Sequence, residues 1–541
     1  MFSAITSVDL SENGRVLFGA AAAAAGVAVL IYGFNPFSRW RYRKVPGDSP
    51  NWLVGTFPSY VSKGFHKTNF ELQKKYGPIT KVFLGRHPLI LVADPDYARQ
   101  ILLRNSDRIN PFRGGAISNS REQQEIDKAS LINSRAPQAK ALRGAWQPTF
   151  NPSSLSEYAP IMNNGAEKLL VRLANAEGKE VNIWRIFGDM TFDVVGSAAF
   201  GVDFDTQTAA GGARPATEDS NDLVTASATV FKAAGVGQGS FLQIIGLVAP
   251  VLVPLVRPFA AAAEALGLLP RSLDEVLRAL GTLRREAMSL TRAAREGGCP
   301  LAASGGGGKP AAGSFLHRLI QHKDAATGCP LSDPAVAAQA VLFMLAGYET
   351  TANTLAFCLY NVALSPGAEA RVLEEVDRFG REAAPSYSDL QDGRFPYITA
   401  VIHETLRLFP PATATAIRTL AEDTALGSTV LPRGTNVLVN ILAMHHDEAL
   451  WESPSEFRPE RFLKGAPGFK PHHPYAHLPF GAGGRQCIGM RFALEEATIA
   501  LVRFYQKYTF RLSPGQVPLE LGRGATQGPK DGVFGIVHSR D

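Results

Sequence analysis

Hydrophobic residues run without interruption by charge over residues 16–34, near the start of the chain. At about 1.5 Å per residue, this run is long enough to cross a lipid bilayer as a helix. A basic cluster follows it closely: Arg39, Arg41, Arg43 and Lys44. Because basic flanks favour the cytoplasmic side, the pattern predicts a retained anchor with the remaining chain in the cytosol. A cleaved secretory signal and an organelle transit peptide are the alternatives.

The same pattern divides the chain into four parts. Residues 1–15 precede the anchor, residues 16–34 form it, and residues 35–50 form a basic hinge whose prolines break any helix. Residues 51–541 then form one large body, because a chain of 541 residues that is 45% hydrophobic can bury a large core.

Short apolar segments follow the hinge. Residues 81–84 and 89–92 are predicted strands joined by a turn over residues 85–88, and a helix begins at Asp94. Residues 104–139 show little periodicity, which is typical of a functional or disordered segment.

A long helix is predicted from Ser332 to Tyr360, with Pro334 in its first turn. Polar residues interrupt its apolar pattern midway, and Gly347 there costs roughly 1 kcal/mol against alanine, so close approach of a ligand is expected. One face carries six residues: Val336, Ala340, Phe343, Gly347, Thr350 and Thr351. A helix of this length is expected to run through the centre of the body.

Composition narrows the functional classes. The net charge of +6 is mild for this length, unlike the concentrated basic patches of nucleic-acid binders, and it suits an anionic membrane surface or an acidic partner. Four cysteines are too few and too scattered for a disulfide framework, so the body is expected in a reducing compartment. They are Cys299, Cys329, Cys358 and Cys487.

Candidate chemistry concentrates around Cys487, which lies among four glycines, three before it and Gly489 after it. Glycines let a loop turn its backbone N–H groups inward, where they stabilise a thiolate, and a thiolate is a metal ligand. A lone cysteine is otherwise most often a small buried hydrophobe. A dinucleotide-binding glycine loop is the weaker alternative, because Gln486 stands where its third glycine is required.

This stretch resembles the haem-binding loop of the cytochrome P-450 family. The family pattern matches at Phe480, Gly483, Arg485, Cys487 and Gly489. The resemblance implies that Cys487 is the axial ligand of the iron of haem b, a type of ligation that favours O–O cleavage, and that the other four residues contact the haem.

Ala346-Gly347-Tyr348-Glu349-Thr350-Thr351 matches the oxygen-activating helix of the same family. The resemblance implies that Thr350 and Glu349 deliver protons and that Ala346 and Gly347 lie against the haem. From the residues alone, the favoured interpretation is that the threonine hydroxyls bond back to carbonyls one turn earlier.

Two arginines match positions that bind haem propionates in the family. Arg143 lies in a predicted helix over residues 140–150, although Ala139 stands where the family has tryptophan, and Arg418 follows a predicted strand. A solvated arginine and a surface salt bridge are the alternatives.

Glu404, Arg407 and Arg461 match the family's buried ionic network, which is structural and not catalytic. The resemblance also implies a substrate pocket at Phe343 and at a strand over residues 412–417, which supplies Thr413, Ala414 and Thr415. A helix over residues 490–505 and a closing hairpin over residues 518–536 complete the pattern.

Three other stretches have less specific interpretations. Residues 244–259 are apolar but contain three prolines, so they are either core or a loop that dips into the membrane surface. Residues 297–314 superficially match a phosphate-binding loop but lack its key residues, so they are read as a flexible linker. The histidines at 445–446 and 472–477 are predicted to be exposed loop residues and not a zinc site.

The resemblance covers the chain from about Lys44 onward, and the C-terminal part is most similar to the clan of animal steroid and drug monooxygenases, thromboxane synthases and plant carlactone oxidases. It implies a mainly α fold with small β-sheets, an N-terminal transmembrane helix, and insertion of one atom of O2 into a lipophilic small molecule. The expected partners are a membrane NADPH-cytochrome P-450 reductase, cytochrome b5 as a second donor, and no nucleic acid. Expected locations are the endoplasmic reticulum or, alternatively, a plastid membrane. A haem-thiolate isomerase or dehydratase and a non-catalytic haem sensor are the other functions considered.

Overall fold

A computed structural model of the chain describes residues 35–48, 51, 54–103, 126, 129–209, 212–213, 222–233, 271–296, 314–322, 328–524 and 526–540. The predicted anchor, the proline-containing segment at 244–259 and most of the predicted linker lie outside these residues. Within the described ranges, no helix combines the length and apolar character that a membrane span requires.

The described chain is mainly helical, with small sheets, as predicted. The longer helices are α3 (Phe57–Lys63), α4 (Phe65–Tyr76), α5 (Pro95–Leu103), α7 (Ala136–Trp146), α8 (Pro152–Ala174), α9 (Ile183–Val195), α10 (Asp222–Ala233), α13 (Arg271–Arg295), α14 (Phe315–Gln321), α15 (Asp333–Ala363), α16 (Pro366–Phe379), α18 (Pro396–Leu408) and α20 (Met490–Lys507). Shorter helices are α2 (Pro36–Arg41), α17 (Tyr387–Gln391), α19 (Ile441–His445), η2 (Gln147–Phe150), η3 (Gly196–Phe200), η6 (Pro459–Phe462) and η7 (Gly483–Arg485).

The strands are β1 (Ile79–Leu84), β2 (His87–Val92), β3 (Glu180–Asn182), β4 (Thr208–Ala209), β5 (Gly212–Ala213), β6 (Ile417–Thr419), β7 (Thr424–Leu426), β8 (Thr429–Leu431), β9 (Asn436–Val439), β10 (Tyr508–Leu512) and β11 (Phe534–Ser539). The four-stranded sheet has the order β1-β2-β9-β6, with β2 parallel to β9 and the other neighbours antiparallel. The predicted hairpin at 81–92 is therefore confirmed, and strands from some 340 residues later complete its sheet.

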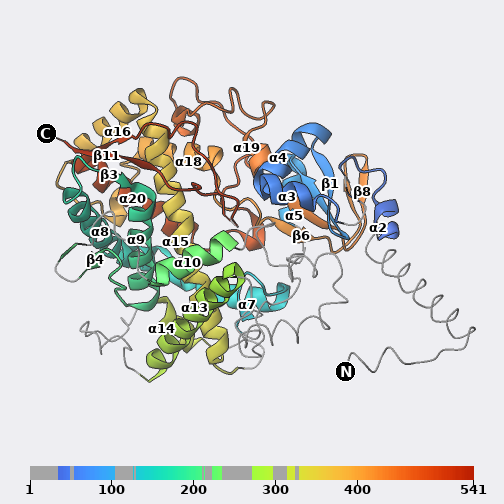
Figure 1. The fold of residues 1–541 in the computed structure, drawn as a ribbon, viewed down its shortest axis with the longest axis horizontal. Helices are drawn as coiled ribbons and strands as arrows, with labels where there is room; N and C mark the ends of the chain where they lie inside the picture. The colour runs from blue at the N-terminus through green and yellow to red at the C-terminus, as the bar shows by residue number, and fades with distance from the viewer. Residues whose placement is uncertain are drawn as a thin grey trace, which may run out of the picture.

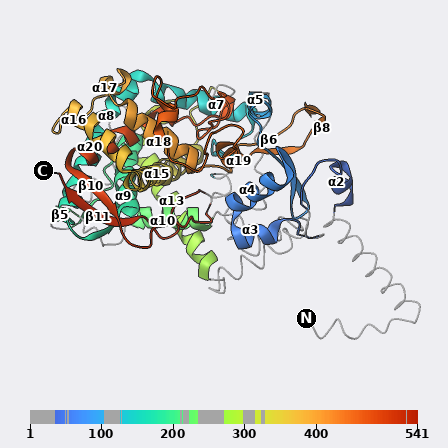
Figure 2. The same cartoon turned by 90° about the horizontal axis from the view of Figure 1, so that it is seen from above.

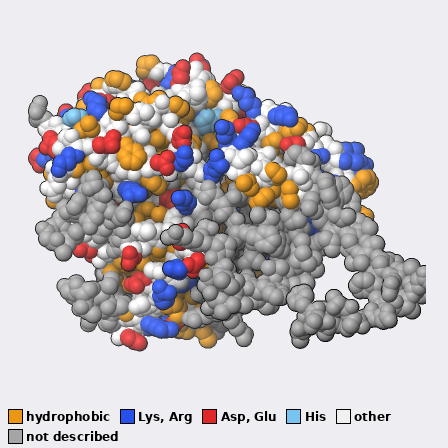
Figure 3. All heavy atoms as spheres, in the orientation of Figure 1, with side chains coloured by type: hydrophobic (Ala, Val, Ile, Leu, Met, Phe, Trp, Pro, Cys, Tyr) orange, Lys and Arg blue, Asp and Glu red, His pale blue; other side chains and the backbone are white. Residues whose placement is uncertain are grey.

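The sheet region and the helical region lie side by side, and α15 runs through the helical region (Figures 1 and 2). Ser332 precedes the first turn of α15 and Pro334 lies in that turn, as the sequence predicts. From Ala352 to Val362 every residue of α15 is buried, which is typical of a helix packed on all sides. Side chains of both charge signs are interspersed over the described surface that faces the viewer in Figure 3.

The closest approach between α15 and α9 explains the glycine in the middle of α15. A Cβ atom at Gly347 would lie 2.6 Å from Cγ2 of Val195 in α9. The missing side chain therefore makes room for a neighbouring helix, and we revise the expectation that a ligand alone requires this glycine.

Three predictions about local structure are wrong. The strand predicted from residue 412 begins at Ile417, because the residues after Pro411 form a turn. The segment predicted as irregular up to residue 139 already becomes α7 at Ala136. His445 is fully buried rather than exposed, and His477 stacks on it with ring centroids 5.2 Å apart.

Candidate active site

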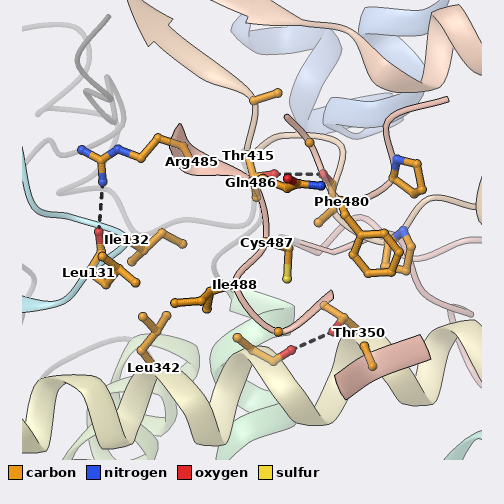
Figure 4. A pocket seen from close by; sticks show the side chains of 18 of the residues that line it. Leu131, Ile132, Leu342, Thr350, Thr415, Phe480, Arg485, Gln486, Cys487 and Ile488 are labelled. Carbon is orange, nitrogen blue, oxygen red and sulfur yellow. Dashed lines mark hydrogen bonds between the residues drawn. The ribbon is translucent and has the colours of Figure 1, made fainter. Parts of the chain in front are cut away.

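A cavity of about 1140 Å³ lies between α15 and the loop that carries Cys487. The side chain of Cys487 points from this loop toward α15, and Thr350 lies on the facing side of that helix (Figure 4). Most of the lining side chains are apolar. The sequence-predicted residues among them are Ala346, Gly347, Thr350, Phe343, Thr415, Arg143, Arg418, Phe480, Arg485, Cys487 and Gly489. The structure therefore brings most of the predicted site residues to one cavity.

Backbone hydrogen bonds and one close contact fix the shape of the cysteine loop. The N–H of Cys487 donates to Phe480 O at 2.9 Å, and the N–H of Gln486 donates to Gly483 O at 3.0 Å. Gly483 has φ of 72°, and a Cβ there would lie 2.2 Å from the carbonyl oxygen of Leu102 in α5. Only glycine fits this position.

Gly489 behaves differently from the expectation that it provides a turn after the cysteine. Its φ is −88°, which any residue can adopt. Its N–H instead donates to Cys487 and thereby favours the thiolate. Gly489 thus contributes a backbone donor directed at the sulfur.

Opposing influences act on the Cys487 thiol. Burial inside the molecule raises its pKa, while the Gly489 N–H and the positive charge of Arg143 lower it. A metal ion bound by the sulfur would add a much larger stabilisation of the thiolate. The loop is therefore arranged for a sulfur that is charged when it is coordinated.

Three guanidinium groups reach the cavity from three different parts of the chain. Arg143 Nη1 donates to Gln486 O at 2.7 Å, and Arg485 Nη2 donates to Ser134 O at 2.9 Å. Arg418 is buried and donates from Nη1 to its neighbour's carbonyl oxygen at 2.9 Å. A guanidinium carries five N–H donors in a rigid fork that suits carboxylates.

These features fit haem b. A thiol at the centre of one wall supplies the iron ligand, apolar side chains surround a flat ligand, and the three arginines supply partners for its two carboxylates. Ala139 also lines the cavity, so the tryptophan of the family pattern has no equivalent there. Among described residues no cluster of three or more His, Cys, Asp or Glu side chains could hold a separate metal ion.

On the opposite wall, Thr350 bonds back along α15. Its hydroxyl donates to Ala346 O at 2.7 Å, and the hydroxyl of Thr354 donates to Thr350 O at 2.8 Å. This is the alternative that the residues alone left open. Both threonines nevertheless line the cavity, and a hydroxyl that donates one hydrogen bond can still accept another.

Glu349 is directed away from the cavity. Its carboxylate accepts a hydrogen bond from the hydroxyl of Thr526, and its side chain is only 8% exposed. Burial raises the pKa of Glu349 to about 7, while hydrogen bonds from Thr526 and Asn353 oppose that rise. Thr526 lines the cavity, so Glu349 adjoins the cavity only through Thr526.

The predicted ionic network forms in the core behind the cysteine loop. Glu404 Oε1 accepts from Arg407 Nη2 at 2.8 Å and from Arg461 Nε at 3.2 Å. Glu404 is 0% exposed. Arg407 also donates to three backbone carbonyls, of His445, Pro454 and Glu456. The network therefore joins α18 to the end of α19, to the segment that precedes η6 and to η6 itself.

Of the three residues that the strand over residues 412–417 was expected to supply to the substrate pocket, one lines the cavity. Thr415 lines the cavity, but the hydroxyl of Thr413 bonds to His66 and Ala414 packs into a separate core cluster. The cause is the turn at residues 413–414, which replaces the predicted strand. Phe343 lines the cavity as predicted and stacks on Trp146 at 4.1 Å between ring centroids.

Sequence reasoning missed several lining residues. Thr354 lies one turn after Thr350, so helical spacing could have identified it. Thr526, Leu131 and Phe231 are brought to the cavity by tertiary structure, and no local signal marks them.

Comparisons with known proteins agree with the geometry. A family model described as cytochrome P-450 matches residues 45–533. Thromboxane-A synthase of Macaca fascicularis is 29% identical over 552 residues, covering 99% of this chain and 100% of that protein. Human cytochrome P-450 3A5 is 29% identical, covering 99% of both chains. Mouse cytochrome P-450 3A13 is 30% identical, covering 95% of both.

Proposed function

Because the chain belongs to the cytochrome P-450 family, whose members bind haem b through a cysteine thiolate, we propose that it is a monooxygenase. It inserts one atom of O2 into a lipophilic small molecule of the sterol, terpenoid, carotenoid-derived or fatty-acid class. The observation that carries the proposal is that Cys487 and Thr350 face each other across one largely apolar cavity. When bound, the haem supplies the activation of O2.

The protein's own residues bind the haem and orient the substrate. When haem is bound, Cys487 would hold its iron, and Arg143, Arg418 and Arg485 would hold its carboxylates. The apolar wall of Phe343 and its neighbours excludes water and positions the substrate.

Thr350 and Glu349 are the proposed proton donors. The Thr350 hydroxyl, fixed on Ala346 O, accepts a hydrogen bond from a water at the cavity edge and holds it there. Glu349, with a pKa of about 7, stores a proton that reaches the cavity through the Thr526 hydroxyl. A group with this pKa donates and accepts protons well near neutral pH.

The electrons are proposed to come from NADPH through a membrane reductase, with cytochrome b5 as a second donor. Lys140 and Arg491 are exposed and lie near the cysteine loop, whereas Arg143 is half-buried against that loop. We therefore assign the acidic partner to Lys140 and Arg491. Reversing both charges should slow reduction of the haem at low ionic strength. An unchanged rate would remove this assignment.

We also propose that the protein resides in the endoplasmic reticulum membrane, with residues 16–34 as a single span and the body in the cytosol. A plastid membrane is the alternative. Protease protection of tagged protein in isolated membranes tests this arrangement, because a cytosolic body is digested without detergent.

A second candidate is a haem-thiolate isomerase or dehydratase that rearranges a peroxide without a reductase. We consider this function because two of the similar proteins are named thromboxane-A synthase. The intact Glu349-Thr350 pair favours the monooxygenase, because a peroxide rearrangement requires no external protons for O–O cleavage. A non-catalytic haem sensor is the third candidate, and substrate-dependent O2 consumption excludes it.

The decisive experiment screens sterols, terpenoids, carotenoid fragments and fatty acids with purified protein, reductase, NADPH and ¹⁸O2. Incorporation of one labelled atom into product supports the monooxygenase. Turnover of a lipid peroxide without NADPH supports the isomerase instead. In Thr350→Ala, product should fall about tenfold or more while NADPH consumption continues and yields hydrogen peroxide. Thr354→Ala, one turn away, is the matched control.

A further inference from the structure

His445 lies behind the cysteine loop, and it belongs to none of the motifs on which the sequence analysis based the resemblance. It is the last residue of α19 and is 0% exposed. Its ring has a polar partner on each nitrogen. Nδ1 lies 3.1 Å from Arg407 O, and Nε2 lies 2.9 Å from the backbone nitrogen of Leu478.

These two partners determine the protonation state of the ring. A carbonyl oxygen only accepts, so Nδ1 must carry a hydrogen, and a backbone N–H only donates, so Nε2 must present its lone pair. Only the neutral Nδ1–H tautomer satisfies both conditions. Burial lowers the pKa of His445 well below its usual value, and the charges of His446 and Arg407 lower it further.

The groups around the ring also favour the neutral form. His477 stacks on it with an angle of 22° between the ring planes, and His403 and His472 lie behind His477. Arg407 is cationic and is paired with Glu404, which also pairs with Arg461. Among the residues that the structure describes, no carboxylate bonds to this ring, whereas Arg407 Nη1 donates to the His445 carbonyl oxygen at 2.7 Å.

Leu478 is the point at which the chain enters the cysteine loop. Its carbonyl oxygen accepts from the N–H of Gly481 at 2.9 Å, and Phe480 O accepts from the N–H of Cys487. The His445 ring links these bonds to the carbonyl oxygen of Arg407, near the end of α18. The ring therefore connects the ionic network to the loop that holds the sulfur.

We propose that His445 is a positioning residue for the haem thiolate. Its neutral ring joins Arg407 O to the Leu478 N–H and thereby sets the position from which the cysteine loop starts. Without an acceptor for the buried Leu478 N–H, the loop shifts, and the sulfur leaves the position from which it would hold the haem iron.

Two substitutions separate the two hydrogen bonds. The amide group of glutamine reaches the position of Nε2, so His445→Gln keeps an acceptor for Leu478. The amide of asparagine reaches only the position of Nδ1, so His445→Asn keeps the donor to Arg407 O and leaves Leu478 without a partner. The readout is the carbon monoxide difference spectrum of purified protein of measured haem content, because its band position reports whether the iron ligand is a thiolate.

We expect His445→Gln to keep a thiolate-type spectrum and His445→Asn to show about a tenfold rise in the ratio of non-thiolate to thiolate species, the equivalent of one buried donor left unpaired. His446→Asn is the control, since its Nδ1 bonds back to Leu442 O in the adjoining helix α19 and not to the cysteine loop. Equal thiolate fractions in the Gln and Asn variants would overturn the proposal.

Hydrogen exchange gives a second test that does not depend on the Asn variant being stable. In the wild-type protein, the Leu478 amide should exchange as slowly as core amides of α18, and His445→Gln should preserve that protection. A Leu478 amide that exchanges at least a hundredfold faster than the α18 core in the wild type would show that the ring does not hold the loop.

Discussion

The wall of the cavity that carries Cys487 and the wall across from it are held by different interactions. Behind the cysteine, buried polar groups of Glu404, Arg407 and His445 are joined by hydrogen bonds of 2.7–3.2 Å. Across the cavity, aromatic and aliphatic contacts predominate, such as the stacking of Phe343 on Trp146. Directional bonds fix one geometry, whereas apolar packing tolerates exchanges that conserve volume.

The difference assigns separate tasks to the two walls. The cysteine wall must place one sulfur within tenths of an ångström, and an unpaired buried charge there is costly. The opposite wall must accept a particular lipophilic shape, which apolar side chains can adjust gradually. Substitutions on the first wall should therefore act abruptly and those on the second wall by degrees.

The largest effect is expected for Cys487→Ala. Loss of the sulfur removes the thiolate band of the carbon monoxide spectrum altogether, because neither Cys329 nor Cys358, the other cysteines that the structure describes, lines the cavity. Cys329→Ala is the matched control, since Cys329 is exposed. A normal thiolate band in Cys487→Ala would contradict the assignment of the iron ligand.

The next largest effect is expected for Glu404→Gln. The change leaves Arg407 and Arg461 without their carboxylate in the core, so the free energy of unfolding should fall by about 3–5 kcal/mol. Urea denaturation followed by circular dichroism measures it. The exposed pair Glu374–Arg378 provides the control, because Glu374→Gln should cost less than about 0.5 kcal/mol. If Glu404→Gln and Glu374→Gln lowered the free energy of unfolding equally, the buried network behind the cysteine would have no special role in stability.

Glu349→Gln should change the pH dependence of stability. The pKa of this carboxyl is raised from 4.5 to about 7, so the folded protein binds the proton more tightly than the unfolded chain does. The resulting stability is fully present below pH 4.5 and is lost as the pH rises through 7. Relative to Glu349→Gln, the wild type should therefore lose about 3 kcal/mol between pH 4.5 and pH 8. A constant difference across this range would show that Glu349 titrates normally.

The smallest effects are expected at two neighbouring threonines. Thr415→Val should change the affinity for phenylimidazole, which binds the haem iron and occupies the cavity, by about two- to fivefold. Thr413→Val should leave that affinity unchanged and lower stability by about 1 kcal/mol, because it loses the bond to His66. If Thr413→Val changed the affinity and Thr415→Val did not, the result would support the strand over residues 412–417 that the sequence predicted.

Local signals account for what the sequence predicted well. Local patterns act on their own neighbours in the chain: the two apolar runs joined by a turn over residues 81–92, the serine and proline at the start of α15, and the glycines around Cys487. The resemblance then related these local elements to one another. For that reason the shared location of Cys487, Thr350 and Arg418 at one cavity could be predicted.

The failures share one physical cause, which is that burial depends on partners distant in sequence. His445 was predicted to be exposed because nothing near it in sequence indicates its packing beneath Arg407 and against His477. Thr526 is 177 residues from Glu349, to which it donates. Thr413 was misplaced because a turn after two prolines resembles the start of a strand.

The contact of Gly483 with the Leu102 carbonyl has a consequence for assembly in the cell. Ribosomes release the N-terminal hairpin and α5 long before β9, β6 and the cysteine loop, yet the sheet and the contact require both ends of the chain. Haem can therefore be loaded only near the end of translation. Until then the edge of β2 that later pairs with β9 lacks its partner, and an unpaired strand edge favours aggregation.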